Sequence, residues 1–268
     1  MRVKTILGVA LIAVMSIACG KPDVDKVDPA PQEPQMLYVK AIKAYNGMPG
    51  YSDYDSSVVF DIDSEKRIAS MRSTWLEDGV EVSDPEITFT YGEGTAVINY
   101  SYDGESGSIN CELNDKGAIT RAVYGGEMMG FVEEFAYNDD GELESYAGRY
   151  GNMDVILLTY EWKNGNIYKV SYGDMEESYT FTHEYTAEAN IYNIDIFHGC
   201  TFACPILCEF VAVNDGLFGK KNHNFLKTVY FGDQTIPVFD YKFKANGELE
   251  YATMGEEGYM VFECFQVL

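Results

Sequence analysis

CELNDKGAI at residues 111–119 returns in altered form as FAYNDDGEL at residues 135–143 and as YEWKNGNI at residues 160–167. In each copy apolar residues alternate with polar ones, a cluster of Asn, Asp and Lys ends in glycine, and the alternation then resumes. The glycines, Gly117, Gly141 and Gly165, lie 24 residues apart. Such a pattern is typical of a β-hairpin, because glycine permits the positive φ that the turn requires. The repeated unit is therefore predicted to be a hairpin.

The same unit recurs on both sides of these three copies. YKFKANGEL at residues 241–249 is a late copy, and FDIDSEKRI at residues 60–68 is an early copy in which Lys66 replaces the glycine. A period of 24 residues accommodates two strands of roughly eight residues and two short turns. Successive hairpins predict an all-β domain built as one large antiparallel meander. Its alternating Tyr, Phe, Val, Ile and Thr indicate one packed face and one solvated face.

The expected strands follow from these alternating stretches. They are residues 57–62, 68–75, 86–91, 95–102, 108–113, 119–124, 131–137, 143–150, 154–162, 167–172, 177–183, 227–231, 237–244, 249–253 and 259–265.

The repeat breaks between residues 186 and 226, since Gly247 lies 82 residues after Gly165 and 82 is not a multiple of 24. Pro205 is a good first helical residue, and Ile206, Leu207, Phe210 and Val211 follow it at the spacing of one helix face. Ile191, Ile194 and Phe197 have the spacing of another helical turn. We therefore expect a short helical insertion near residues 187–215 that covers an open end or the concave face of the sheet.

The first 19 residues have the pattern of an export signal. Arg2 and Lys4 give a positive start, residues 6–15 form an apolar run too short to span a bilayer, and small residues precede Cys19. This pattern resembles a bacterial lipoprotein signal, with residues 1–18 as the signal peptide and Cys19 as the site of lipidation. The alternative is an ordinary secretory signal in which the cysteine is incidental.

Residues 19–36 are rich in proline and acidic residues and cannot bury enough apolar surface to order themselves, so they predict a disordered tether. Residues 37–268 are then expected to form a single β-hairpin-repeat domain. The predicted address is an outer-membrane lipoprotein, and both the periplasmic and the cell-surface side remain open.

The charge of the chain excludes several partners. After loss of Arg2 and Lys4 with the signal, 17 basic residues face 43 acidic ones, a formal charge of −26. Nucleic acid is therefore not an expected partner, and membrane contact is expected through the lipid alone. Residues 61–65, DIDSE, lack the turn glycine and distal Glu of a calcium loop, so they are interpreted as a solvated strand end.

The lipoprotein start, the Tyr-rich hairpins and the segment GLFGKKNHNFL at residues 216–226 together resemble a known family. It is a family of Bacteroidetes lipoproteins of unknown function whose domain is described as having a porin-like fold. The resemblance covers residues 38–268 and implies a long antiparallel sheet curled as an open or partial barrel. It assigns no activity and no functional residue.

Five cysteines remain after Cys19, namely Cys111, Cys200, Cys204, Cys208 and Cys264. The middle three recur every four residues beside His198, a spacing that permits metal binding. No second pair follows, however, and Pro205 would disrupt a helix that aligned them. Buried thiols or disulfides are the favoured interpretation, and no metal or cofactor is predicted.

No catalytic residue is predicted, because three histidines and no nucleophile motif support no triad. The adjacent acidic pairs at residues 133–134, 139–140, 176–177 and 256–257 leave a glycoside-processing enzyme with paired carboxylates as the alternative function. The favoured function is non-catalytic binding or scaffolding at the envelope, with a glycan or an envelope protein as partner. Tyr160 and Trp162, which share one strand face, are the candidate binding residues.

Overall fold

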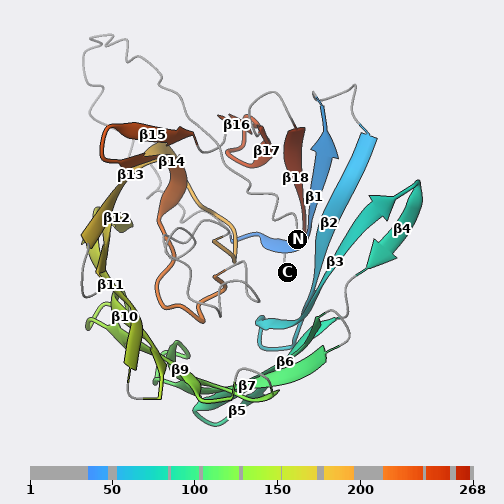
Figure 1. Ribbon diagram of the computed structural model, residues 1–268. Coiled ribbons are helices and arrows are strands. Elements are labelled where there is room, and N and C mark those ends of the chain that lie inside the picture. Colours follow the sequence, from blue (N-terminus) through green and yellow to red (C-terminus); the bar gives the residue numbers. More distant parts are fainter. Residues whose placement is uncertain are drawn as a thin grey trace, which may run out of the picture.

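One antiparallel sheet of 18 strands accounts for nearly all regular structure in this computed structural model. The structure describes residues 36–47, 53–83, 86–102, 105–126, 129–151, 153–173, 178–195, 214–237, 240–253 and 258–265. The sheet curls round on itself like the wall of a barrel (Figure 1). The all-β, open-barrel prediction is therefore confirmed. Within the described ranges, no helix is long and apolar enough to cross a membrane.

The strands follow the predicted hairpins closely. They are β1 (Tyr38–Asn46), β2 (Asp53–Ile62), β3 (Ile68–Glu77), β4 (Val80–Ser83), β5 (Ile87–Gly92), β6 (Thr95–Tyr102), β7 (Glu105–Leu113), β8 (Ile119–Tyr124), β9 (Phe131–Tyr137), β10 (Leu143–Tyr150), β11 (Met153–Lys163), β12 (Asn166–Gly173), β13 (Ser178–Ala189), β14 (Asn224–Phe231), β15 (Gln234–Pro237), β16 (Asp240–Phe243), β17 (Leu249–Thr253) and β18 (Gly258–Phe265).

Neighbours in the chain are neighbours in the sheet, and the two ends of the domain meet because β1 pairs with both β2 and β18. The hairpin of β3 and β4 leaves the wall, and β3 also pairs with β5. One seam remains: no ladder in the described part of the chain joins β14 or β15 to β16. Across this seam Tyr241 of β16 donates a hydrogen bond to the carbonyl of Leu226 in β14 (2.9 Å) and packs on Phe225.

The repeated turns share one construction. Gly117, Gly141, Gly165 and Gly247 all have φ between 76° and 85°, and Lys66 adopts the same conformation with a φ of 70°. In three copies an Asn or Asp side chain at the start of the turn accepts two backbone N–H groups; these acceptors are Asp63, Asn114 and Asn138. The hairpin interpretation of the repeat is therefore confirmed, including its glycine-free copy.

Each of these hairpins also carries a register shift where its second strand begins. We call the buried apolar residue at the start of the second strand of each hairpin the post-turn residue; these are Ile68, Ile119, Leu143, Ile167 and Leu249. All five are at most 4% exposed and belong to the core. Each post-turn residue still pairs with the first strand of its hairpin, beside a bulge that disrupts the ladder locally, and it also bonds to partners outside the hairpin.

The described part of the insertion supplies many of those partners. Residues 190–195 and 214–223 lie on the concave side of the sheet (Figure 1), where Tyr192, Ile194, Leu217 and Phe218 are buried. Four post-turn N–H groups donate to this segment, at distances of 2.8–3.1 Å: Ile68 to Asp215, Ile119 to Leu217, Ile167 to Asn222 and Leu249 to Tyr192. The expected cover over the concave face is therefore present in the described residues.

The helical part of that prediction needs a correction. Residues 187–189 continue β13, and Tyr192 and Asp195 form bridges to Leu37 and Asn214 instead of a helical turn. Extended backbone is favoured here because it lets residues 191–195 pair with Leu37, directly before β1, and with Asn214 in the returning chain. The helix expected at residues 205–211 lies outside the described residues, as does Phe197.

Candidate functional site

The candidate site lies where two neighbouring strands separate. The ladder between β12 and β13 runs only from Lys169–Thr182 to Gly173–Ser178. The ladder therefore does not include the start of β12 (residues 166–168) or the middle of β13 (residues 183–186). The bulge at Ile167 causes this separation, because it rotates the start of β12 out of the plane of the ladder.

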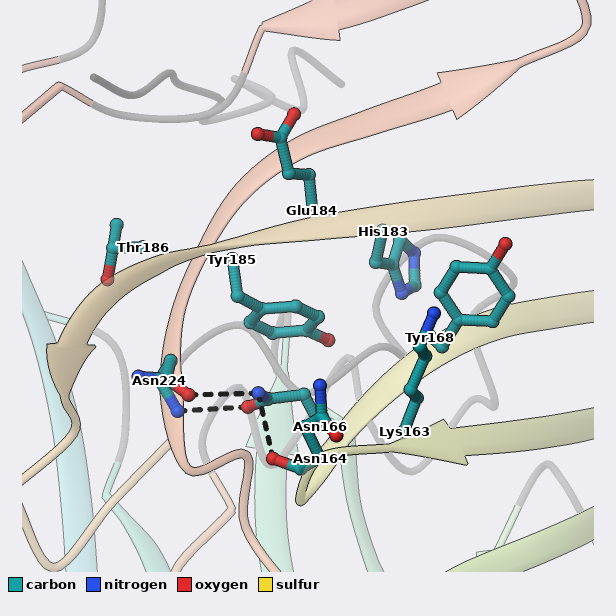
Figure 2. Close-up of a pocket in the computed structure, with 9 residues that line it drawn as sticks. All are labelled: Lys163, Asn164, Asn166, Tyr168, His183, Glu184, Tyr185, Thr186 and Asn224. Carbon is teal, nitrogen blue, oxygen red and sulfur yellow. Dashed lines mark hydrogen bonds between the residues drawn. The ribbon is translucent and has the colours of Figure 1, made fainter. Parts of the chain in front are cut away.

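A pocket of about 300 Å³ opens at this separation. Its lining residues come from the β11–β12 turn, from β12, β13 and the start of β14, and they are Lys163, Asn164, Asn166, Tyr168, His183, Glu184, Tyr185, Thr186 and Asn224 (Figure 2). We call it the β12–β13 pocket. No adjacent pair of carboxylates is among these residues, so the lining offers amide, aromatic and hydroxyl groups in the main.

The amide groups of the pocket are held by each other. Asn166 donates from Nδ2 to Oδ1 of Asn224 (3.0 Å), and the backbone N–H of Asn224 donates to Oδ1 of Asn166 (2.9 Å). Asn224 also donates to the carbonyl of Glu188 (3.0 Å). These two hydrogen bonds join the start of β12 to the start of β14, 58 residues away in the chain, so the floor of the pocket is rigid.

The rear of the pocket is formed by two rings that converge on one carbonyl. Tyr185 donates its O–H to the carbonyl of Ile167 (2.7 Å), and His183 Nδ1 lies 3.1 Å from the same oxygen. A carbonyl only accepts, so Nδ1 of His183 carries the hydrogen in this contact. Figure 2 shows both rings on one side of β13, with Glu184 pointing the opposite way.

The entrance holds the exposed aromatic side chain. Tyr168 is 41% exposed, and the Lys163 ammonium lies 5.1 Å from the centre of its ring. Glu184, by contrast, is engaged outside the pocket by Lys227 and by the hydroxyl of Tyr230 (2.8 Å). These hydrogen bonds, Lys227 first, lower the pKa of Glu184, which therefore stays ionised and paired.

The contact of Tyr185 with Ile167 belongs to a series. An aromatic side chain from a following strand donates to the carbonyl at the start of a strand five times, at 2.7–3.0 Å: Tyr91 to Ile68, Tyr137 to Ile119, Trp162 to Leu143, Tyr185 to Ile167 and Tyr241 to Leu226. Each bond bridges strands at a point that no backbone ladder joins. We call such a gap between two strands, bridged by an aromatic side chain and not by a backbone ladder, a window. The candidate pocket therefore lies at one of several windows in the sheet.

The predicted binding residues lie inside this architecture. Tyr160 is 6% exposed and belongs to the core, and Trp162 packs against the core while its Nε1–H donates to the carbonyl of Leu143 (2.8 Å). This placement favours a structural role for both side chains, so partner binding by the pair stays a prediction. Cys19, the predicted lipidation site, lies outside the described residues.

Sequence reasoning did not identify the residues of the β12–β13 pocket. Asn166, Tyr168, His183 and Asn224 come from the three neighbouring strands β12, β13 and β14 and are far apart in the sequence. One signal was present: Tyr185 follows Ile167 by 18 residues, as Tyr137 follows Ile119. This shared spacing marks two equivalent windows.

The adjacent acidic pairs do not converge where the structure describes them. Glu133 is fully buried and accepts the hydroxyls of Tyr124 (2.5 Å) and Tyr146 (2.8 Å), whereas Glu134 pairs with Arg149. Consecutive strand residues face opposite sides of a sheet, so these two carboxylates cannot flank one bond. The pair at 139–140 lies in an exposed turn, and residues 176–177 and 256–257 lie outside the described ranges.

Two cysteines are described, and both are free thiols. Cys111 is buried, and burial, with a further contribution from Glu133, raises the pKa of its thiol to about 12, whereas Cys264 is exposed. The cluster of His198, Cys200, Cys204 and Cys208 lies outside the described residues. Among those that are described, no three His, Cys, Asp or Glu side chains are grouped to hold a metal ion.

Comparisons with known proteins give a likeness of fold. No family model and no curated protein matches the sequence. A crystal structure of a porin-like protein from Bacteroides uniformis superposes with a TM-score of 0.65 over 85% of this chain and all of that one, at 14% sequence identity. The chain therefore has a porin-like fold, as the resemblance implied, and at this identity the likeness shows the fold alone.

Proposed function

We propose that the chain is a lipid-anchored protein of the bacterial outer membrane and that its sheet is a non-catalytic binding module for a neutral glycan. The lipoprotein signal ending at Cys19 supports the anchor. The likeness to a porin-like protein is consistent with a place in the envelope and with membership of the Bacteroidetes lipoprotein family.

The observation that carries the binding proposal is the composition of the β12–β13 pocket. An exposed Tyr168 ring stands at the entrance, and the fixed amides of Asn166 and Asn224 form the floor. Aromatic rings pack on the apolar faces of sugars, while amides both donate to and accept from hydroxyl groups. A rigid floor reduces the entropy lost on binding, since the polar groups are already ordered.

The charge of the protein selects a neutral ligand. The mature chain has a formal charge of −26, which repels polyanionic glycans at long range. Glu184, which points away from the pocket, is paired with Lys227, and the Lys163 ammonium lies against the ring of Tyr168. A neutral oligosaccharide therefore meets no free carboxylate of Glu184 at the site.

Binding to a panel of neutral oligosaccharides tests the proposal, with maltose, cellobiose, xylobiose and chitobiose and the corresponding hexasaccharides as probes. Tyr168→Ala is expected to weaken binding of the active probe at least about tenfold, a loss of about 1.4 kcal/mol. Tyr150→Ala is the matched control, because Tyr150 is 52% exposed and lies outside the pocket. Equal binding by both variants, or no binding of any probe by the wild type, would overturn the proposal.

A further inference from the structure

A second pocket occupies the equivalent window two hairpins earlier in the chain. It encloses about 560 Å³ where β8 and β9 separate, beyond a ladder that joins only residues 121–123 to residues 132–134. Its lining includes Lys116 and the turn amides Asn114 and Asn138, with Tyr137 and Phe135 from β9. We call it the β8–β9 pocket.

The two pockets share the frame of the repeat, although the counterpart of Tyr168 in the β8–β9 pocket is Thr120. Ile119 and Ile167 are 48 residues apart, as are Tyr137 and Tyr185, and each tyrosine donates to the carbonyl of its own isoleucine. Phe135 stands at the position of His183. Both pockets thus combine a lysine, turn amides and a tyrosine that closes the window.

A third hollow of about 410 Å³ extends the β8–β9 pocket toward β11. It shares Phe135 and Ala136 with that pocket and continues over Ser145 and Ala147 to Leu157 in β11. Ala136 pairs with Ser145, and Ala147 pairs with Leu157, so small side chains floor this hollow across three strands. Arg149 at its edge is paired with Glu134 and with Asp154.

We propose that these hollows form one track across β8 to β13 that binds an extended neutral glycan chain, with the β8–β9 and β12–β13 pockets as its two end subsites. Strands in a sheet are about 4.8 Å apart, so the four steps from β9 to β13 separate the subsites by about 19 Å. A disaccharide occupies one subsite, whereas a longer chain engages both. This inference rests on the proposed function and specifies the length of its ligand.

When one ligand already occupies the first subsite, its contact with the second subsite is intramolecular. The affinity for that ligand therefore rises although neither subsite changes. The track therefore predicts a strong dependence on chain length. The hexasaccharide of the active series should bind at least about tenfold more tightly than its disaccharide.

Ala136→Phe tests the track directly, because Ala136 is exposed and lies in both the β8–β9 pocket and the third hollow. The phenyl ring fills the track without entering the core. The variant is expected to bind the hexasaccharide as weakly as the disaccharide and to leave disaccharide binding at the β12–β13 pocket unchanged. Thr90→Phe is the matched control, since Thr90 is exposed on β5, outside the track.

The outcomes separate this inference from the proposed function. Equal affinity of the wild type for disaccharide and hexasaccharide, or hexasaccharide binding that survives Ala136→Phe, would overturn the track and leave the β12–β13 pocket standing. Absence of binding by every probe would overturn the proposed function, and the track with it.

Discussion

Three post-turn residues have both backbone groups bonded to distant parts of the chain. Ile68, Ile119 and Ile167 each donate an N–H to the insertion and accept a hydrogen bond at the C=O from an aromatic side chain. All three are fully buried, so an unmade bond would leave a polar group without water. These contacts explain how strands that separate at their ends stay joined in one curled wall.

The hydroxyl of Tyr91 isolates one of these contacts. Tyr91→Phe removes the bond to the Ile68 carbonyl (3.0 Å) and retains the ring, so the free energy of unfolding should fall by about 1 kcal/mol. Urea unfolding followed by tryptophan fluorescence measures the change. Tyr150→Phe, at an exposed site, should change stability by less than about 0.5 kcal/mol. Equal stability of the two variants would contradict the structural role of the series.

Asp215 offers a test with a defined pH dependence. Its carboxylate accepts the N–H of Ile68 (3.1 Å), and burial raises its pKa above 3.8. The folded state therefore binds the proton more tightly than the unfolded state, and this group's contribution to stability falls as pH rises from 3.8 through the raised pKa. Asp215→Asn keeps an acceptor but does not titrate.

The stability of the wild type relative to Asp215→Asn should therefore decrease between pH 4 and pH 7. Asp215→Ala, which leaves the buried Ile68 N–H without its acceptor, should cost about 1–3 kcal/mol at both pH values. Urea unfolding of the three proteins measures both effects. A relative stability that increases with pH would contradict the assigned environment of the carboxylate.

Among the elements, the hairpins with a strong turn signal were predicted almost residue by residue. Lys66 was correctly placed at a glycine position, because the surrounding alternation outweighed the missing glycine. Three strands were missed: β1 follows the tether without a turn cluster, while β4 and β15 are only four residues long. The single strand expected at 237–244 is instead the end of β15 and the separate strand β16.

The candidate site was beyond the reach of sequence periodicity for a different reason. Alternation predicts which face a residue occupies but not where a ladder ends, and the pockets exist because bulges end the ladders early. Asn166 and Asn224 meet only after the insertion has returned the chain to the β11–β12 turn. Such a contact between distant segments leaves no periodic signal.

Gly219 tests how the insertion is held against the hairpins. It has a φ of 78°, and a Cβ there would lie 2.6 Å from the carbonyl oxygen of Gly141 and 2.5 Å from the ring of Tyr137. Gly117 has a similar φ of 84° and nothing within 4 Å. Gly117→Ala should thus cost about 1 kcal/mol from the backbone alone, and Gly219→Ala at least about 2 kcal/mol, because it also overpacks the contact.

Thermal unfolding of the two glycine variants under the same conditions separates the cost of backbone strain, which both share, from the cost of overpacking at Gly219. The larger drop in Tm is expected for Gly219→Ala. Equal drops would contradict the close approach of the insertion to the β9–β10 turn.

On the scale of the whole molecule, the curled sheet is filled and not hollow. Inward-facing residues of nearly every strand and the buried residues of the insertion form a single hydrophobic core. Side-chain contacts join β14 to β16 at the seam, where the described residues form no backbone ladder. For the binding function that we propose, this filled interior favours the gaps between strands as the place of contact with a ligand.

The anchor is tested at this scale by Cys19→Ser. Only the thiol of Cys19 stands at the predicted lipid site, so the variant should remain an unlipidated precursor that incorporates no labelled fatty acid. The wild-type protein expressed in a Gram-negative host is the reference. Incorporation that persists in the variant would exclude the lipoprotein interpretation.

The most direct test of the central claim is NMR chemical-shift mapping of the protein titrated with the active oligosaccharide. Binding at the β12–β13 pocket predicts that the largest shifts fall on Asn166, Tyr168, His183 and Asn224, with smaller changes along Ala136 and Ser145 for the longer chain. Chemical-shift changes confined to residues outside these pockets would contradict the account. An example is the stacked pair Tyr45 and Tyr259 in β1 and β18.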